Sequence, residues 1–266
     1  MAGSLVSDLY LSSINTNLAS ITSSVQLSPK ETAEAVKTNG IVIFPAAIDP
    51  DTVSDLNTEF DRMLDPEVRA ATGFQVDEDD GLTNIRVIRE RLNPAACPAT
   101  AALYANPWMD EVSAAYYGVG AYQLNDEIFI SDITETPGGK LNLPFALHFD
   151  KRQVLKFFVY LTDTDERNGA MRASPGSQII NRQRRLEAME HGTLNEIPNV
   201  LPEPDVPSVP ITGLAGTIFV FDTDMCHGAG QVEAGRSRRT MRGHTHSRQM
   251  LDAMAQDAAT TNNQPV

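Results

Sequence analysis

Residues 217–222 read Thr-Ile-Phe-Val-Phe-Asp, and a short turn connects them to Cys226-His227-Gly228-Ala229-Gly230. An apolar run of this length, rich in β-branched and aromatic residues, predicts a buried β-strand. His227 comes shortly after the strand, and the glycines beside it allow another backbone to approach closely. The stretch therefore predicts a histidine at the end of an inner strand, in a position that suits a metal ligand. The alternative is a turn histidine on the surface.

Further short strands are predicted in the second half of the chain, separated by turn signals such as Asn168-Gly169 and Pro175-Gly176. They lie at residues 123–131, 146–150, 154–162 and 239–247. The first half has helix signals instead, with Ser28 and Asp49 as N-caps before prolines. Helices are predicted at 28–39, 49–64, 99–104 and 108–117, a strand at 41–44, an acidic turn at 77–81, and a late helix at 177–190. Helices first and strands afterwards indicate an α+β fold, mainly β, in which a sandwich or barrel is buttressed by N-terminal helices.

The length of 266 residues fits one large domain or two small ones. We expect a flexible N-terminal arm at residues 1–28, a single domain at 29–250 and a disordered tail at 251–266, because both ends are polar and poor in apolar periodicity. No internal repeat interrupts the central part.

Composition excludes several classes of protein. The chain has 35 acidic against 21 basic residues, a net charge of −14, which disfavours binding to nucleic acid or to an anionic membrane surface. No apolar run approaches the ~18–20 residues that span a bilayer. The first 29 residues carry one charge, Asp8, and so resemble neither a secretory signal nor a mitochondrial leader. Two distant cysteines, Cys97 and Cys226, are expected to be reduced thiols in a cytoplasmic protein.

His148 and Asp150 form the second chemical signal. In a strand, residues two apart project from the same face, so this imidazole and carboxylate would point together. They supply two members of a 2-His-1-carboxylate triad, which leaves coordination positions of Fe(II) open for a cosubstrate and O2. With five histidines in the chain, a lone His-x-Asp is a weak signal, and His227 is the candidate for the third ligand.

Other charged residues leave alternatives open. His244 and His246 would share a strand face with Arg238 and Arg242, either near the mouth of a site or at an exposed strand end. Several cations are candidates to face an acidic group or are plain surface charges: Arg86, Arg89, Arg91, Lys151 and Arg152. The arginines at 182, 184 and 185 are expected on a solvated helix face.

Four motifs together resemble the phytanoyl-CoA dioxygenase (PhyH) family. They are His148-Phe149-Asp150, residues 163–170 (Asp-Thr-Asp-Glu-Arg-Asn-Gly-Ala), residues 173–177 (Ala-Ser-Pro-Gly-Ser), and His227-Gly228-Ala229-Gly230-Gln231. Arg238 also stands eleven residues after His227, where the family has an arginine. The resemblance spans about residues 30–250. Gln178 stands where a histidine is usual, and Ala229 where relatives often carry a hydroxyl residue.

The resemblance implies a double-stranded β-helix, a cupin-like jelly roll, and a non-haem Fe(II)/2-oxoglutarate-dependent oxygenase. It implies that His148, Asp150 and His227 ligate the iron and that Arg238 holds the distal carboxylate of 2-oxoglutarate. A guanidinium suits that role because it grips a carboxylate with two hydrogen bonds. Arg239 would take the role if the register slipped by one residue. Phe158 lies where several relatives place an aromatic side chain against the cosubstrate.

The expected reaction consumes O2 and 2-oxoglutarate, hydroxylates an unactivated C–H bond of a small metabolite or natural-product intermediate, and releases succinate and CO2. Halogenating relatives replace the carboxylate ligand by Gly or Ala, so Asp150 favours hydroxylation, with desaturation or cyclisation left open. The alternatives are a cupin-type metalloenzyme that does not use 2-oxoglutarate and a non-catalytic jelly-roll binding protein. We expect a monomer or homodimer, with the loops at 134–143 and 178–206 choosing the substrate.

Overall fold

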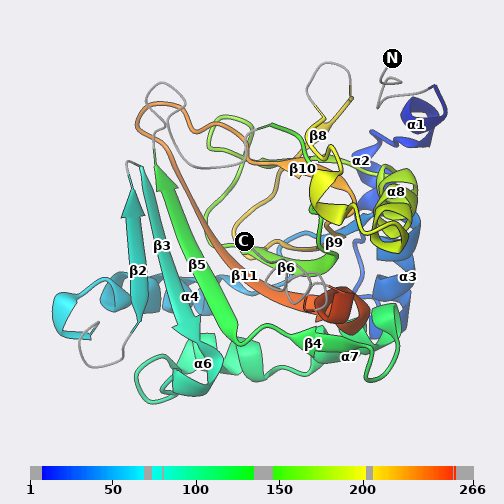
Figure 1. The fold of residues 1–266 in the computed structure, drawn as a ribbon. Coiled ribbons are helices and arrows are strands. Elements are labelled where there is room, and N and C mark those ends of the chain that lie inside the picture. The colour runs from blue at the N-terminus through cyan, green and yellow to red at the C-terminus, as the bar shows by residue number, and fades with distance from the viewer. Residues whose placement is uncertain are drawn as a thin grey trace.

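The structure is a computed structural model that describes residues 8–68, 74–79, 81–134, 146–201, 206–253 and 255. Two antiparallel sheets form the core of these residues (Figure 1). The larger sheet has the strand order β1 (Ile41–Phe44), β9 (Ile218–Asp222), β6 (Val154–Tyr160), β11 (Ser237–Ser247), β5 (Glu127–Thr134), β3 (Leu82–Ile88) and β2 (Gln75–Asp79), and β4 (Tyr122–Leu124) also pairs with β11. The smaller sheet has the order β10 (Cys226–Gly228), β7 (Met171–Ser174) and β8 (Val209–Ile211).

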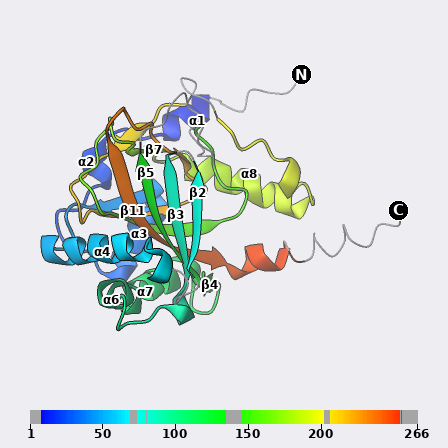
Figure 2. The same ribbon diagram turned by 90° about the vertical axis from the view of Figure 1, so that its left-hand side faces the viewer.

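Helices surround this core. They are α1 (Asp8–Ser13), α2 (Leu18–Ile21), α3 (Pro29–Asn39), α4 (Pro50–Met63), α6 (Pro98–Ala105), α7 (Trp108–Tyr117) and α8 (Gln178–Glu190), with short 3-10 turns at Arg89–Arg91 and Leu194–Glu196. Figure 2 shows α4 and α6 on one side of the molecule and α8 on the other. The mainly β fold with buttressing helices, which the sequence predicts, is confirmed.

Local sequence explains the helix ends. In α3 the Ser28 hydroxyl accepts a hydrogen bond from the Glu31 amide, and the Glu31 carboxylate accepts one from the Ser28 amide, which together make a capping box. Gly40 ends the helix in the left-handed conformation with φ of 83°. The buried Gln178 side chain donates to the Thr38 carbonyl at 3.0 Å and so completes this helix end.

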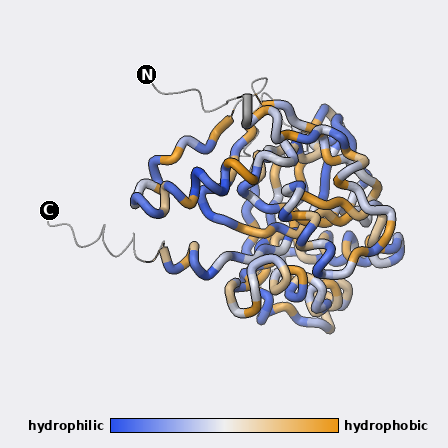
Figure 3. The backbone as a smooth tube through the Cα atoms, turned by 90° about the vertical axis from the view of Figure 1, so that its right-hand side faces the viewer, coloured by the Kyte–Doolittle hydropathy of each residue, from blue (hydrophilic) through white to orange (hydrophobic). Residues whose placement is uncertain are grey.

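The larger sheet has two chemically different faces. Its outer face packs under the helices: Met241, Ile130 and Val159 contact the α4 side, and Phe157 and Val220 contact the α3 and α7 side. The inner face looks toward the smaller sheet. There an apolar cluster of Tyr160, Phe219, Phe221, Met171, Ala173 and Ile211 joins the two sheets. Figure 3 shows hydrophobic stretches running through the strands of the interior.

Two local expectations are wrong. Residues 146–150 do not form a strand, because His148 makes only isolated bridges, to Val200 and to His227. The expected acidic turn begins inside β2, which pairs with β3 as a hairpin in the register Gln75↔Arg86 to Asp79↔Leu82. Charged residues occupy this hairpin, so its sequence lacks the apolar alternation that marks a strand.

The expected N-terminal arm is partly ordered. Residues 8–28 include α1 and α2, the Tyr10 side chain is fully buried, and the Asn15 amide donates to the Pro175 carbonyl at 2.7 Å. A side chain at Gly176, whose φ is 95°, would collide with the Ser13 carbonyl. This part of the arm therefore packs against the sheets rather than forming a loose segment. Residues 1–7 and 256–266 lie outside the described residues, so the proposed domain limits stay predictions.

Candidate metal centre

Backbone hydrogen bonds bring the segments of His148 and His227 together. The His148 amide donates to the His227 carbonyl at 3.0 Å, and the His227 amide donates to the His148 carbonyl at 2.8 Å. The Asp150 amide donates to the Thr223 carbonyl, in the turn that leads to β10. These contacts place three side chains from distant parts of the sequence at one point between the sheets.

The three side chains converge on a common centre. One ligand atom from each of His148, Asp150 and His227 lies within 4.8 Å of the others. The Oδ1 atom of Asp150 is 3.6 Å from His148 Nε2 and 3.9 Å from His227 Nε2. Two imidazoles and one carboxylate on one side of a divalent ion match the donor set of a facial triad. The residues therefore fit a ferrous ion.

The outer nitrogens of both imidazoles are already occupied. His148 Nδ1 lies 3.0 Å from the Ala146 carbonyl, and His227 Nδ1 lies 2.8 Å from the Met225 carbonyl. A carbonyl oxygen only accepts, so each Nδ1 carries the proton and each Nε2 keeps its lone pair for a metal. The backbone thus selects the tautomer that a metal ligand needs.

Asp150 stays ionised although it is partly buried. Burial alone would raise the pKa of its carboxyl, but the Lys156 ammonium outweighs that effect, and the pKa falls to about 2. The Lys156 Nζ lies 2.8 Å from Asp150 Oδ2. Burial, followed by Lys156, lowers the pKa of His227 to about 3, so this imidazole is neutral at physiological pH. Both groups therefore have the charge state required for binding a cation.

Arg238 lies on the inner face of β11. Its side chain is buried, and its Nη1 donates to the Gly169 carbonyl. The register Arg238↔Ile133 and Thr240↔Tyr160 gives it the same face as Tyr160. Burial lowers the pKa of the guanidinium while the nearby Tyr160 works in the opposite direction. A buried cation on this face suits a bound carboxylate.

Arg239 lies on the opposite face. Its Nη2 is 3.0 Å from both Asp132 Oδ2 and Asp61 Oδ1, and its guanidinium lies over the Phe60 ring. Arg239 therefore holds α4 against the sheet, and the slipped register is not needed to explain it. The expected solvated arginine face of α8 is wrong in part. Arg185 is buried, with its Nε 2.6 Å from Asp224 Oδ1.

Phe158 also lies on the inner face. Its ring centroid is 5.2 Å from that of Phe219 and 5.6 Å from that of Phe221. The centroid of the Phe221 ring in turn lies 5.0 Å from that of the His227 ring. An aromatic wall therefore leads from Phe158 toward the three converging side chains, while contact with a cosubstrate stays a prediction.

His244 is not at an exposed strand end. Its ring lies 5.2 Å from that of Phe129, and its buried Nε2 has no hydrogen-bond partner among the described residues. His244 faces Lys156 across the strand pair, and neither His244 nor His246 joins the three-residue cluster. Lys156 is the functional neighbour that sequence reasoning passed over. The only signal for it was its position two residues before Phe158 on the same strand.

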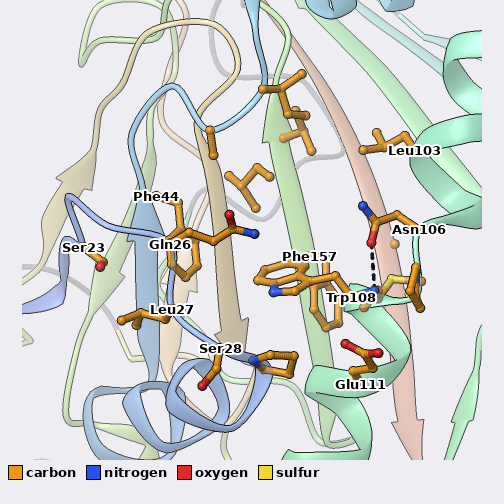
Figure 4. A pocket seen from close by; sticks show the side chains of 18 of the residues that line it. Ser23, Gln26, Leu27, Ser28, Phe44, Leu103, Asn106, Trp108, Glu111 and Phe157 are labelled. Atoms are coloured by element: carbon orange, nitrogen blue, oxygen red, sulfur yellow. Dashed lines mark hydrogen bonds between the residues drawn. The ribbon is translucent and has the colours of Figure 1, made fainter.

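The cavity in Figure 4 lies elsewhere. It has a volume of about 760 Å³ and is lined by apolar residues such as Phe44, Trp108 and Phe157 on the outer face of the larger sheet. The Trp108 ring packs edge-on against both phenylalanines, at 5.8 and 5.9 Å. Because the sheet separates this cavity from the three converging side chains, it is not part of the candidate metal centre.

Comparison of the sequence with known families gives a match over most of the chain. The profile of the phytanoyl-CoA dioxygenase (PhyH) family matches residues 36–240. The chain belongs to this family. As a PhyH-family protein it is a non-haem Fe(II)/2-oxoglutarate-dependent oxygenase, and iron and 2-oxoglutarate are its cofactor and cosubstrate. None of the curated proteins compared with it matches its sequence.

Solved structures share the jelly-roll fold of this PhyH-family protein. SnoK, a non-haem α-ketoglutarate-dependent carbocyclase from nogalamycin biosynthesis, has a TM-score of 0.57 and 19% identity, and the alignment covers 84% of this chain and 85% of SnoK. The epimerase SnoN of the same biosynthesis has a TM-score of 0.55 and 17% identity, and the alignment covers 82% of each chain. HygX from Streptomyces hygroscopicus, with nickel and 2-oxoglutarate bound, has a TM-score of 0.54 and 15% identity, and the alignment covers 84% of this chain and 88% of HygX. No described helix is both long and apolar enough to cross a bilayer.

Proposed function

We propose that the protein hydroxylates an unactivated C–H bond of a small organic molecule, with release of succinate and CO2. The observation that carries this proposal is the convergence of His148, Asp150 and His227 in a family of oxygenases. The presence of a carboxylate at position 150 favours hydroxylation over halogenation, because it occupies the coordination position that a halide would need. Desaturation and ring formation would use the same metal ligands, and analysis of the product distinguishes them from hydroxylation.

The residues have separate tasks in this proposal. His148, Asp150 and His227 hold the iron through Nε2, Oδ1 and Nε2, and Arg238 holds the distal carboxylate of 2-oxoglutarate. When bound, the iron and 2-oxoglutarate supply the oxidising chemistry, in which O2 is consumed and 2-oxoglutarate is decarboxylated. The aromatic wall of Phe158, Phe219 and Phe221 excludes water from the space between the sheets. Lys156 keeps Asp150 ionised and orients it by the 2.8 Å contact.

The substrate class is inferred from chemistry and from the structural neighbours. SnoK and SnoN belong to nogalamycin biosynthesis, and HygX has been solved with hygromycin B bound, so the neighbours support a natural-product intermediate as substrate. The structure describes only part of the two loops that are expected to select the substrate, because residues 135–145 and 202–205 are outside the described residues. A monomer or homodimer in the cytoplasm stays our prediction, and two buried free cysteines agree with a reducing compartment.

Anaerobic titration tests the proposed site. Purified protein receives one equivalent of Fe(II) and then 2-oxoglutarate, and the charge-transfer absorption of the chelate should rise to saturation at one equivalent of iron. Succinate formation with a panel of metabolites then identifies the substrate. Oxygen uptake that ignores 2-oxoglutarate would favour a cupin-type metalloenzyme, and failure to bind iron would favour a binding protein.

Arg238→Ala should weaken 2-oxoglutarate binding about 10–100-fold, the size expected for losing a charge-assisted pair of hydrogen bonds. The measurement is the half-saturation concentration of the charge-transfer band in iron-loaded protein. Iron affinity itself should change little, because Arg238 is not among the converging ligands. Arg91→Ala, at an exposed position, removes the same charge and is the matched control. An Arg238 variant with unchanged 2-oxoglutarate affinity would contradict the assignment.

A further inference from the structure

Arg242 is a second arginine on the inner face of β11. It pairs across the sheet with Phe158 on one side and Phe129 on the other. Residues two apart on a strand share a face, so Arg238, Arg242 and His244 all look toward the smaller sheet. Arg238 and Arg242 are four residues apart, which separates their Cα atoms by about 13 Å. The two guanidinium groups therefore define two distinct places in the interior.

The guanidinium of Arg242 has no acidic partner among the described residues. No hydrogen bond or ion pair joins it to any of them, and its buried Nε is unpaired. Its contact is the Phe129 ring, 4.7 Å from the guanidinium carbon. Arg86, which pairs with the same Phe129 in the sheet, has its Nε 3.1 Å from Asp77. Arg242 thus differs from its partnered neighbour.

The electrostatic surroundings of Arg242 are positive. Burial, followed by the positive charge of Arg238, lowers the pKa of Arg242 to about 10, while Tyr104 opposes the shift. The buried His244 Nε2 beside it also lacks a hydrogen-bond partner within the part of the chain that the structure describes. Lys156 on the same face is already neutralised by Asp150. A half-buried guanidinium without a counter-ion among the described residues is unfavourable, and the simplest compensation is an anion that enters from outside.

We propose that Arg242, with the His244 imidazole beside it, binds an acidic group of the primary substrate, a carboxylate or a phosphate carried on an apolar body. This inference rests on the proposed function, in which Arg238 takes the acid of the cosubstrate. The rings of Phe129 and Phe158 flank Arg242 on its two neighbouring strands and provide the apolar wall. His244 continues the same face toward Lys156 and Asp150, so a molecule anchored at Arg242 extends toward the metal centre.

The first test needs no substrate. Arg242→Met removes the charge and keeps an apolar side chain against Phe129. If the guanidinium serves a ligand, the ligand-free variant should unfold at the same temperature as wild type or higher, because an uncompensated, half-buried charge has been removed. A structural role would lower that temperature. The control is Arg91→Met, which removes one exposed charge from the same protein.

The second test uses defined probes. The iron-loaded, 2-oxoglutarate-saturated protein is titrated anaerobically with phenylacetate, phenyl phosphate and the neutral phenylacetamide. We expect one or both acids to shift the charge-transfer band and raise the unfolding temperature of wild type and Arg91→Met, and the amide to have no effect. In Arg242→Met the acid affinity should fall at least tenfold, while Arg242→Lys should retain part of it. Whichever of phenylacetate and phenyl phosphate binds more tightly shows whether the site prefers a carboxylate or a phosphate.

Three results would overturn the inference. Acids and the amide with equal effects on wild type would show that no anion site exists. Acids that bind wild type and Arg242→Met equally would place the anion elsewhere. A 2-oxoglutarate affinity lost in Arg242→Met as in Arg238→Ala would assign Arg242 to the cosubstrate instead. Failure of the proposed function gives a different result. In that case the wild-type protein shows no charge-transfer band with Fe(II) and 2-oxoglutarate, even before any acid is added.

Discussion

Asp150→Ala should abolish succinate formation while leaving a folded protein. The variant removes the only carboxylate of the three converging side chains and the negative charge that Lys156 contacts at 2.8 Å. Changes to residues that merely support metal ligands already cost 10–100-fold in affinity or activity, so loss of a ligand should exceed about 100-fold. The measurements are succinate formation with the coupled substrate and the stoichiometry of bound Fe(II).

The matched control for this variant is Asp55→Ala, which removes an exposed carboxylate from α4. It should bind one equivalent of iron and form succinate at the wild-type rate. Circular dichroism and the unfolding temperature show whether each variant is folded. An Asp150→Ala protein that is folded and still forms succinate at more than a few per cent of the wild-type rate would contradict the assignment of Asp150 to the iron.

Arg185→Met should destabilise the protein by about 3–5 kcal/mol, the usual cost of breaking a buried ion pair by removing one partner. Arg185 Nε lies 2.6 Å from Asp224 Oδ1, and its Nη2 lies 2.9 Å from Oδ2, with both side chains almost fully buried. The pair ties α8 to the turn between β9 and β10, next to His227. The measurement is the free energy of unfolding from denaturant titration.

A control substitution in the same helix separates the effect of losing the Arg185 charge from the effect of placing a methionine in α8. Gln183→Met lies on the exposed side of α8, where the side chain bonds only Glu187 among the described residues, and should change the free energy of unfolding by less than about 0.5 kcal/mol. The double variant Arg185→Met/Asp224→Asn should lose less than the sum of its single variants, because each single variant strands the charge of the other residue, whereas the double variant removes both charges. Additive losses would show that the pair is not coupled.

The helices and long strands could be predicted because their signals are local. Ser28, Glu31 and Gly40 determine both ends of α3 without help from the rest of the chain. The apolar run before His227 predicted β9, and two-residue alternation along the strand predicted at 239–247 placed Arg238 and Arg242 on one face. Two-residue spacing suggested that His148 and Asp150 point together, but the placement of His227 beside them rested on the family resemblance, because no local pattern relates residues 77 positions apart in sequence.

Tertiary contacts account for what could not be predicted. The segment around His148 bonds to Val200 on one side and His227 on the other, each for a single bridge, so its extended backbone is not a regular strand. Arg185 was expected in solvent because Asp224, its partner, lies 39 positions away in sequence. The unpaired state of Arg242 also has no sequence signature, since it depends on which acidic residues share its face and on their reach.

The reciprocal hydrogen bonds between the backbones of His148 and His227 have a consequence for how the enzyme acquires its metal. Because main-chain pairing holds the imidazoles side by side, the centre is preorganised, and we expect it to accept several divalent ions with little rearrangement. Selection among them then falls to intrinsic affinities and to supply, and copper, nickel or cobalt outcompete ferrous iron whenever they are present. Preparations of this protein should therefore be stripped with a chelator and reloaded before their specific activities are compared.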